Sequence, residues 1–203
     1  MLEDITKIDQ KILVLFTHDY TISYSIRAIT QKINANYSNT FKRIKRLIKK
    51  NIFLERKEGS SNLVYFNIKS PYAMKLLSFI ESQQKINNSS LELIINKATL
   101  IDPFVSIGLF GSRVSGKATK DSDWDIFILT CNPKEMNKLM SFFPYIRNIQ
   151  VQVFSLEEFK ESLISKEETV VKHIIRNKQM LYNPFPFYNL IQEWEMIKYA
   201  PRS

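Results

Sequence analysis

Two aspartates separated by one residue are the feature of this chain with the clearest chemical meaning. Asp123 and Asp125 come just before an apolar run, 126–129, which is typical of a buried strand. Side chains at i and i+2 of a strand point to the same face, so we expect the two carboxylates to lie close together. Like charges at that spacing repel unless a cation lies between them. Carboxylate oxygens are ligands that suit Mg²⁺ or Mn²⁺, so the pair is a candidate metal site.

A glycine-serine turn precedes the aspartates at a spacing that suits phosphate binding. Gly111 and Ser112 follow an apolar run, 105–110, so the expected layout is strand, tight turn, short helix, loop and strand. Backbone N–H groups and a hydroxyl at the start of a helix stabilise anions. A phosphate cradle beside a pair of Mg²⁺ ligands predicts that this segment binds a nucleoside triphosphate.

The segment resembles the motif of the nucleotidyltransferase superfamily, which includes the catalytic core of DNA polymerase β. The likeness is greatest to the minimal nucleotidyltransferases, whose motif has Gly-Ser, a nearby glycine, and Ser-Asp-x-Asp before an apolar strand. One departure is Ser115, where many members carry arginine; here an arginine stands at position 113 instead. The residues at matching positions are Gly111, Ser112, Gly116, Ala118, Asp121, Ser122, Asp123 and Asp125.

This resemblance implies both a reaction and a set of site residues. The reaction is Mg²⁺-dependent transfer of a nucleoside monophosphate from a nucleoside triphosphate to a hydroxyl acceptor, with pyrophosphate released. Asp123 and Asp125 would be the catalytic residues that hold the metal. Catalysis would come chiefly from positioning and charge neutralisation. The residues implied in nucleotide binding are Gly111, Ser112, Arg113, Gly116 and Ser122.

The superfamily takes a third carboxylate from a later strand, and here that strand has none. In the predicted strand 149–154, side chains alternate between the two faces, so Gln150 and Gln152 share one face. We assign the position of the third carboxylate to Gln152. Glu157 or Glu158 could supply the missing acid, although both also suit the first turn of a helix. Two functions therefore stay open. The first is an active enzyme, and the second is a transcriptional regulator whose degenerate domain binds nucleotide without turnover.

The elements around the motif predict a mixed sheet flanked by helices. Glycine, proline and capping signals delimit the expected helices. A strand over 149–154 follows the crossover helix, which gives an α/β arrangement. The expected helices are 91–101, 133–143, 156–163, 167–177 and 187–199.

The N-terminal third carries most of the positive charge. Residues 1–70 hold 13 Lys and Arg against 6 Asp and Glu, a net charge of +7, while residues 71–203 hold 16 against 14. Helical spacing predicts helices over 4–16 and 23–33, and a third helix that begins at Ser38. Phe41, Ile44 and Ile48 form the expected apolar stripe of that third helix. Apolar stretches at 52–54 and 63–68, joined by a polar loop, read as a β-hairpin.

Three helices and a hairpin with a basic third helix resemble a winged helix-turn-helix. This resemblance implies binding to double-stranded DNA, with the third helix in the major groove and the hairpin on the backbone. The alternative is that the basic face is simply solvated. The candidate groove residues are Asn36, Ser38, Asn39, Lys42, Arg43 and Arg46, on a basic face shared with Lys45 and Lys49; the candidate backbone contacts are Arg56 and Lys57.

The sequence therefore predicts an α+β or α/β protein in three parts. These are a winged helix over 1–70, a linker helix over 71–88, and a nucleotidyltransferase-like domain over 89–203. The apolar helix 72–85 offers a surface for a second copy of the chain or a partner protein. Cys131 is the only cysteine, which excludes an intrachain disulfide and favours a reducing compartment. Without a leader or a membrane-length apolar run, we expect a cytoplasmic protein that does not enter a membrane.

Overall fold

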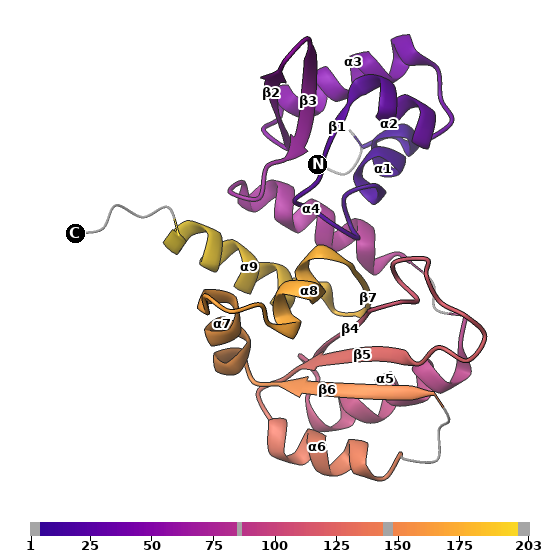
Figure 1. Cartoon of the computed structure of the whole chain (residues 1–203), viewed down its shortest axis with the longest axis vertical. Helices are drawn as coiled ribbons and strands as arrows, with labels where there is room; N and C mark the ends of the chain where they lie inside the picture. The colour runs from indigo at the N-terminus through magenta and orange to yellow at the C-terminus, as the bar shows by residue number, and fades with distance from the viewer. Residues whose placement is uncertain (1–4, 85–86, 144–147, 199–203) are drawn as a thin grey trace. The chain divides into compact units, whose positions relative to one another are not determined.

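The computed structural model describes residues 5–84, 87–143 and 148–198, and these residues divide into two compact units (Figure 1). The first unit is Met1–Ile80 and the second is Glu81–Ser203. The division falls inside helix α4, Pro71–Ser82, which belongs to the predicted linker. The end of the predicted linker helix, Lys85, lies outside the described residues. No helix among the residues described is both long and apolar enough to cross a bilayer.

The first unit packs three helices against a small antiparallel sheet. Its strands are in the order β1-β3-β2. The predicted hairpin is confirmed, and its strands extend well into the expected polar loop, so that only Gly59 and Ser60 lie between them. Gly59 has a φ of 58°, which glycine adopts without strain. The elements are α1 Lys7–Val14, β1 Ser23–Ser25, α2 Ile26–Lys32, α3 Tyr37–Lys49, β2 Phe53–Glu58 and β3 Ser61–Phe66.

Two helix starts in this unit differ from the sequence prediction. Residues 23–25 form strand β1, and α2 begins only after Ser25, whose hydroxyl accepts a hydrogen bond from the Ala28 N–H. Helix α3 is capped by Asn36, whose Oδ1 accepts from the Asn39 N–H at 3.3 Å, so Ser38 lies inside the helix. Asn is as good an N-cap residue as Ser, and Asn36 lies directly before the first turn of α3.

The buried face of α3 is rotated relative to the predicted apolar stripe. Thr40, Ile44 and Leu47 are buried, whereas Phe41 is 40% exposed. The Thr40 hydroxyl donates to the Asn36 carbonyl at 2.9 Å, which satisfies a polar side chain inside the unit. The stripe therefore runs through a threonine that an apolar pattern does not detect.

The second unit is built on a four-stranded sheet in the order β6-β5-β4-β7. The sheet is mixed, as the sequence predicted. β4 pairs antiparallel with β5 and β7, and β5 pairs parallel with β6. Its elements are α5 Ser89–Ile101, β4 Ser106–Phe110, β5 Trp124–Leu129, α6 Pro133–Ser141, β6 Ile149–Phe154, α7 Leu156–Ile164, α8 Val170–Arg176, β7 Lys178–Tyr182 and α9 Pro184–Lys198.

Alternating side chains of the two central strands reach both faces of this sheet. Ile107 and Ile126 join a buried cluster with residues of α5 and α6, and these helices cover one face (Figure 1). On the other face the rings of Phe127 and Phe187 lie 5.6 Å apart, and Phe187 also packs on Phe159. The motif between β4 and β5 is thus held by strands that are buried on both faces.

The largest error of the sequence prediction in this unit is strand β7. The expected helix over 167–177 is shorter, Val170–Arg176, and after Asn177 the residues Lys178–Tyr182 form an edge strand paired with β4. α9 begins at Pro184 rather than at Phe187, because proline fits the first turn of a helix. Its predicted last residue, Tyr199, lies outside the described residues.

Candidate functional site

Gly111 and Asp125 are packed against each other where β4 and β5 meet. Phe110 lies opposite Asp125 in the antiparallel register, so Gly111 begins the turn beside this carboxylate. Gly111 has a φ of 77°, and a Cβ at this position would lie 2.0 Å from Asp125 Oδ2. Only glycine leaves room for the carboxylate and adopts this backbone without strain. The contact joins the predicted phosphate turn to the predicted metal ligand.

The segment after Gly111 is a series of turns, so the predicted short helix is wrong. The Ser115 N–H donates to the Gly111 carbonyl at 3.1 Å, and the Lys117 N–H donates to the Ser112 carbonyl at 3.0 Å. Gly116 has a φ of 72°, and nothing lies within 4 Å of a Cβ placed there. Within the described parts of the chain the Ser112 hydroxyl has no hydrogen-bond partner. Anion binding here would rest on turn N–H groups and this hydroxyl instead of a helix dipole.

Arg113 and Ser122, both predicted to bind nucleotide, make contacts that fold the loop. The guanidinium of Arg113 lies 4.3 Å from the centre of the Trp124 ring. It donates through Nε to the Asp123 carbonyl at 3.2 Å, and through Nη2 to the Ser122 carbonyl. The Ser122 hydroxyl accepts from the Thr119 N–H at 2.8 Å. These bonds fix the backbone immediately before β5, which positions the two aspartates.

The two aspartates form a half-buried pair of carboxylates. Asp123 comes directly before β5, and Asp125 is the second residue of that strand. Burial raises the pKa of the Asp125 carboxyl, and the neighbouring charge of Asp123 raises it further, against a smaller lowering by Arg113. The pair therefore repels when both groups are ionised, and two anionic oxygen donors at one place fit a divalent cation. The residues described contain no group of three or more acidic, His or Cys side chains that could together hold a metal ion.

Gln150, and not Gln152, is the glutamine in contact with this pair. Gln150 Nε2 donates to Asp123 Oδ2 at 2.7 Å, and Gln150 lies opposite Asp125 in the parallel register. Gln152 lies opposite Phe127, two residues further from the aspartates. The sequence could not fix this choice, because both glutamines share a face and only the strand register separates them.

The acids that follow β6 have a structural explanation. Glu158 stands at the third position of α7, where its carboxylate accepts from the Ser155 N–H at 2.8 Å. The Ser155 hydroxyl accepts in return from the Glu158 N–H at 3.0 Å. This reciprocal pair is a capping box, and it agrees with the alternative that the acids belong to the first turn of a helix. Glu157 lies in the same first turn.

A cavity of about 360 Å³ opens beside the glycine turn. Gly111 and Ser115 line it together with residues of α8. Asn177 joins the turn to the end of α8, because its Nδ2 donates to the Gly111 carbonyl at 3.2 Å. The sequence prediction gave no role to His173 or Arg176, although both line this cavity. Local patterns gave no signal for them, since they approach the motif only through the pairing of β4 with β7. The full lining is Phe110, Gly111, Ser115, Val170, His173, Arg176 and Asn177.

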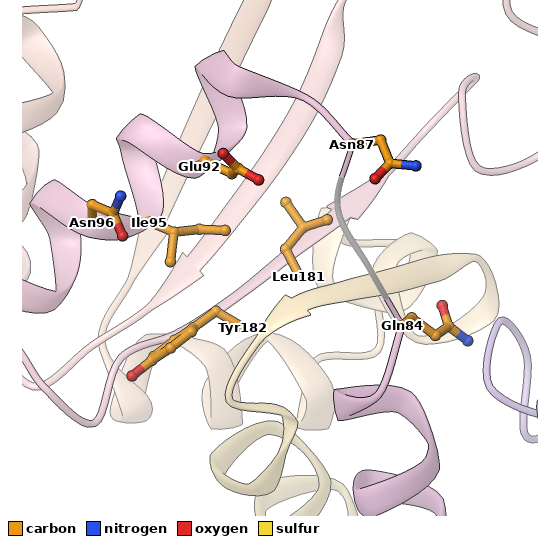
Figure 2. Close-up of a pocket in the computed structure, with 7 residues that line it drawn as sticks. All are labelled: Gln84, Asn87, Glu92, Ile95, Asn96, Leu181 and Tyr182. Atoms are coloured by element: carbon orange, nitrogen blue, oxygen red, sulfur yellow. The ribbon is translucent and has the colours of Figure 1, made fainter.

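A second cavity, of about 580 Å³, lies between α5 and the far end of β7 (Figure 2). Figure 2 shows Leu181 and Tyr182 of β7 facing α5, with amide side chains around them. Among the described residues, its lining contains one carboxylate, that of Glu92, and no residue of the glycine-aspartate motif. The smaller cavity, in contrast, is lined by Gly111 and Ser115 of that motif; Asp123 and Asp125 line neither cavity in the part of the chain that the structure describes. The lining of the second cavity is Gln84, Asn87, Glu92, Ile95, Asn96, Leu181 and Tyr182.

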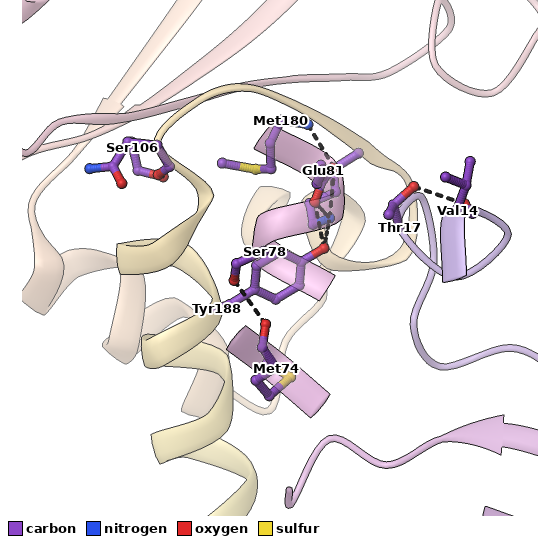
Figure 3. A network of polar contacts seen from close by, with 10 residues as sticks. Val14, Thr17, Met74, Ser78, Glu81, Ser106, Met180 and Tyr188 are labelled. Carbon is purple, nitrogen blue, oxygen red and sulfur yellow. Dashed lines mark hydrogen bonds and ion pairs between the residues drawn. The ribbon is translucent and has the colours of Figure 1, made fainter. Parts of the chain in front are cut away.

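A buried ion pair holds β7, which lines the second cavity and begins directly after Asn177, a lining residue of the first. Lys178, the first residue of β7, and Glu81 are both fully buried, with Nζ and Oε2 3.2 Å apart. Figure 3 shows Glu81 also accepting from the Tyr188 hydroxyl, at 2.5 Å, and from the Met180 N–H, at 2.9 Å. Lys178 Nζ lies 4.6 Å from the centre of the Tyr188 ring. A buried charge with this many partners is satisfied, and it fixes the start of β7 next to Asn177.

The residues predicted to contact DNA lie on α3 and β2 of the first unit. Ser38 and Asn39 are exposed in the first turn of α3, and Lys42 and Lys49 are exposed further along it. Arg46 lies near Lys42 and Lys49 on the helix surface and is partly buried. Lys57 of β2 is exposed; Arg56 is also exposed and lies 5.7 Å from the centre of the Tyr65 ring.

Two basic residues of α3 are engaged inside the unit. Arg43 forms an ion pair with the fully buried Asp9, and its Nε donates to Asp9 Oδ1 at 2.8 Å. Burial acts to raise the pKa of Asp9, but hydrogen bonds from Arg43 and Thr6 outweigh it and hold the pKa below its ordinary value. Lys45 pairs with Glu55 of β2 at 2.7 Å. Arg43 therefore links α3 to α1, a role that the sequence prediction did not give it.

Comparison with known proteins identifies the second unit. Residues 92–184 match the family model described as "Polymerase beta, Nucleotidyltransferase". The match covers the glycine turn, both aspartates, α8 and β7, and it does not extend to the first unit. Neither the curated proteins nor the solved structures compared with the chain gave a match. The chain therefore contains a polymerase β-like nucleotidyltransferase domain, formed by residues 92–184.

Proposed function

We propose that the second unit transfers a nucleoside monophosphate from a nucleoside triphosphate to a hydroxyl acceptor. The observation that carries this proposal is the contact of Gly111 with the Asp125 carboxylate, which puts a phosphate turn and a metal ligand side by side. Asp123 and Asp125 would hold Mg²⁺ or Mn²⁺, which when bound neutralises phosphate charge.

The chain's own groups would act mainly by positioning. Ser112 and the turn N–H groups would hold the β- and γ-phosphates, so that the acceptor oxygen attacks the α-phosphorus in line and pyrophosphate leaves. The bonds from Arg113 to the Ser122 and Asp123 carbonyls would keep the loop from moving when the phosphates bind. A preorganised loop lowers the cost of reaching the transition state.

A second candidate function is nucleotide binding without turnover, as part of a regulator. It is favoured by Gln150, a neutral residue whose amide donates to Asp123 Oδ2 beside the carboxylate pair. A neutral amide cannot accept a proton from the acceptor hydroxyl, and it leaves the site with one negative charge fewer for a second dication.

Labelling separates the two candidates. The full chain would be incubated with each of the four α-³²P-labelled ribonucleoside triphosphates, Mg²⁺ or Mn²⁺, and a cell extract as the source of acceptor. We expect label in a macromolecule or small acceptor, and loss of that label with Asp123→Asn. Triphosphate binding by the wild-type chain without any transfer of label would instead support the regulatory candidate.

We also propose that the first unit binds double-stranded DNA through α3 and the β2–β3 hairpin. Residues 1–70 carry a net charge of +7, and the exposed part of α3 presents Lys42 and Lys49 with Ser38 and Asn39. Phosphate contacts by such lysines release counterions, so the affinity should fall steeply as salt rises. Arg43 is not part of this surface, because it pairs with Asp9.

A gel-shift assay with the full chain and random duplex DNA tests this proposal. Lys42→Glu with Lys49→Glu should weaken binding at least tenfold and reduce the salt dependence. Lys7→Glu with Lys11→Glu makes the same change in net charge on exposed residues of α1, and it should weaken binding much less. Equal losses from the two pairs would mean that only the net charge matters and that α3 has no special role.

A further inference from the structure

The one arginine within residues 111–116, the turn that would hold the triphosphate, is engaged by the loop itself. Position 115 is a serine, whose hydroxyl donates to the Ser112 carbonyl at 3.1 Å. The arginine two residues earlier, Arg113, directs its guanidinium onto Trp124 and onto loop carbonyls. A nucleoside triphosphate carries about four negative charges, so positive charge beyond that of Lys117 and Lys120 in the same loop would strengthen its binding.

Two basic side chains of α8 line the same cavity as this turn. His173 and Arg176 are three positions apart, which puts them on the same face of the helix. Gly111 and Ser115 of the turn also line the cavity. The Asn177 amide, which donates to the Gly111 carbonyl, fixes the end of α8 against the turn. The cavity is therefore lined by residues of the turn and by His173 and Arg176, together with the apolar Phe110 and Val170.

The Arg176 guanidinium forms an ion pair with one acid of the same unit. Arg176 Nη1 lies 2.6 Å from Glu168 Oε1, and His173 Nε2 lies 3.9 Å from the same oxygen. The Arg176 and Glu168 side chains are 58% and 50% exposed, and ion pairs this exposed contribute little to stability, about 0–1 kcal/mol. A triphosphate offers more charge and more acceptor oxygens to a guanidinium than one carboxylate does.

We propose that Arg176, assisted by His173, binds the terminal phosphates of the nucleoside triphosphate, and that Glu168 competes with these phosphates for Arg176. Helix α8 thus supplies the positive charge that position 115 lacks. This inference rests on the proposed triphosphate site, and it adds the residues that set its affinity. Arg176 is a binding residue in this account, and Glu168 is a built-in competitor.

Titration calorimetry on the full chain tests the proposal with three probes: Mg²⁺-ATP, Mg²⁺-tripolyphosphate and AMP. Arg176→Gln should weaken binding of ATP and tripolyphosphate about tenfold, because a charge-assisted hydrogen bond is lost. Glu168→Gln should strengthen the binding of ATP and of tripolyphosphate about threefold, since Arg176 is released from its ion pair with Glu168. Lys160 and Glu193 form an ion pair of similar exposure, 2.9 Å apart, on α7 and α9. Lys160→Gln and Glu193→Gln are therefore matched controls, and neither should change the affinities.

The outcomes separate this inference from the proposed function. If the wild-type chain binds ATP and tripolyphosphate but Arg176→Gln behaves like Lys160→Gln, the role of Arg176 is overturned and the triphosphate site stands. If Arg176→Gln weakens AMP as strongly as ATP, the cavity binds the nucleoside part and the inference is wrong. If the wild-type chain binds no triphosphate, both proposals fail.

Discussion

Replacing Gly111 by alanine should damage the site far more than the same change at Gly116. Both glycines have left-handed backbones, with φ of 77° and 72°, so both substitutions cost about 1–2 kcal/mol in backbone strain. They differ in what the new Cβ meets. At position 116 nothing lies within 4 Å, whereas at position 111 Asp125 Oδ2 lies 2.0 Å away. Cβ atoms essentially never approach another atom within 3.0 Å, so the carboxylate must move by at least the difference, 1 Å.

Such a movement is large compared with the tolerance of a metal site. Mg²⁺ holds its oxygen ligands at about 2.0–2.1 Å in nearly ideal octahedral geometry. We therefore expect Gly111→Ala to weaken Mg²⁺-ATP binding about 10- to 100-fold, the usual cost of displacing a metal-site residue. Gly116→Ala should lower the free energy of unfolding through backbone strain by about as much as Gly111→Ala does. It should leave the affinity for Mg²⁺-ATP within about threefold of the wild-type value.

Urea unfolding and titration calorimetry on both variants give the two numbers. The Mg²⁺-ATP affinities of the two variants are compared at equal fractions of folded protein, which removes the effect of the backbone strain that both share. The remaining difference in affinity then reports on the displacement of Asp125. Equal loss of Mg²⁺-ATP affinity in the two variants would refute the reasoning, because Gly116 has no contact with either aspartate.

Three further predictions concern charge. Asp125→Asn should raise the melting temperature at pH 7. The pKa of this carboxyl is raised in the folded state, so its ionisation destabilises the fold as the pH rises above the ordinary value of 3.8. Thermal unfolding at pH 3, where the carboxyl is protonated in both states, should therefore show no gain. Gln150→Asp should lower the free energy of unfolding by about 1 kcal/mol in EDTA, with recovery in Mg²⁺, whereas Gln152→Asp should show a smaller loss by chemical denaturation. Lys178→Met should destabilise the fold by about 3–5 kcal/mol, because it leaves a buried carboxylate without its cation. The double variant Lys178→Met with Glu81→Gln should lose less, as a double-mutant cycle in urea would measure.

The sequence predicted the glycine turn, the paired aspartates and the mixed sheet because these depend on local patterns. A strand, a Gly-Ser turn and Asp-x-Asp before a second strand specify one another within about twenty residues, and the antiparallel pairing of β4 and β5 brings them together. The hairpin of the first unit was predictable for the same reason, since its strands are neighbours in the chain.

The features that the sequence did not predict depend on pairing between distant segments. Strand β7 begins with a charged residue, Lys178, whose burial is made possible by Glu81 almost a hundred residues earlier. The cavity residues of α8 meet the turn only through β7. The contact of Gln150 with Asp123 follows from a parallel register that no periodicity fixes. Arg43 looked like a DNA contact because its buried partner, Asp9, lies 34 residues away.

The central claim is that Asp123 and Asp125 hold the metal of a bound nucleoside triphosphate. Calorimetric titration of the full chain with each ribonucleoside triphosphate, in Mg²⁺ and in EDTA, tests it most directly. We predict binding that requires Mg²⁺ in the wild-type chain and is lost with Asp123→Asn and Asp125→Asn together, while circular dichroism shows that the double variant keeps its fold. Triphosphate affinity that is unchanged in the double variant would contradict the claim.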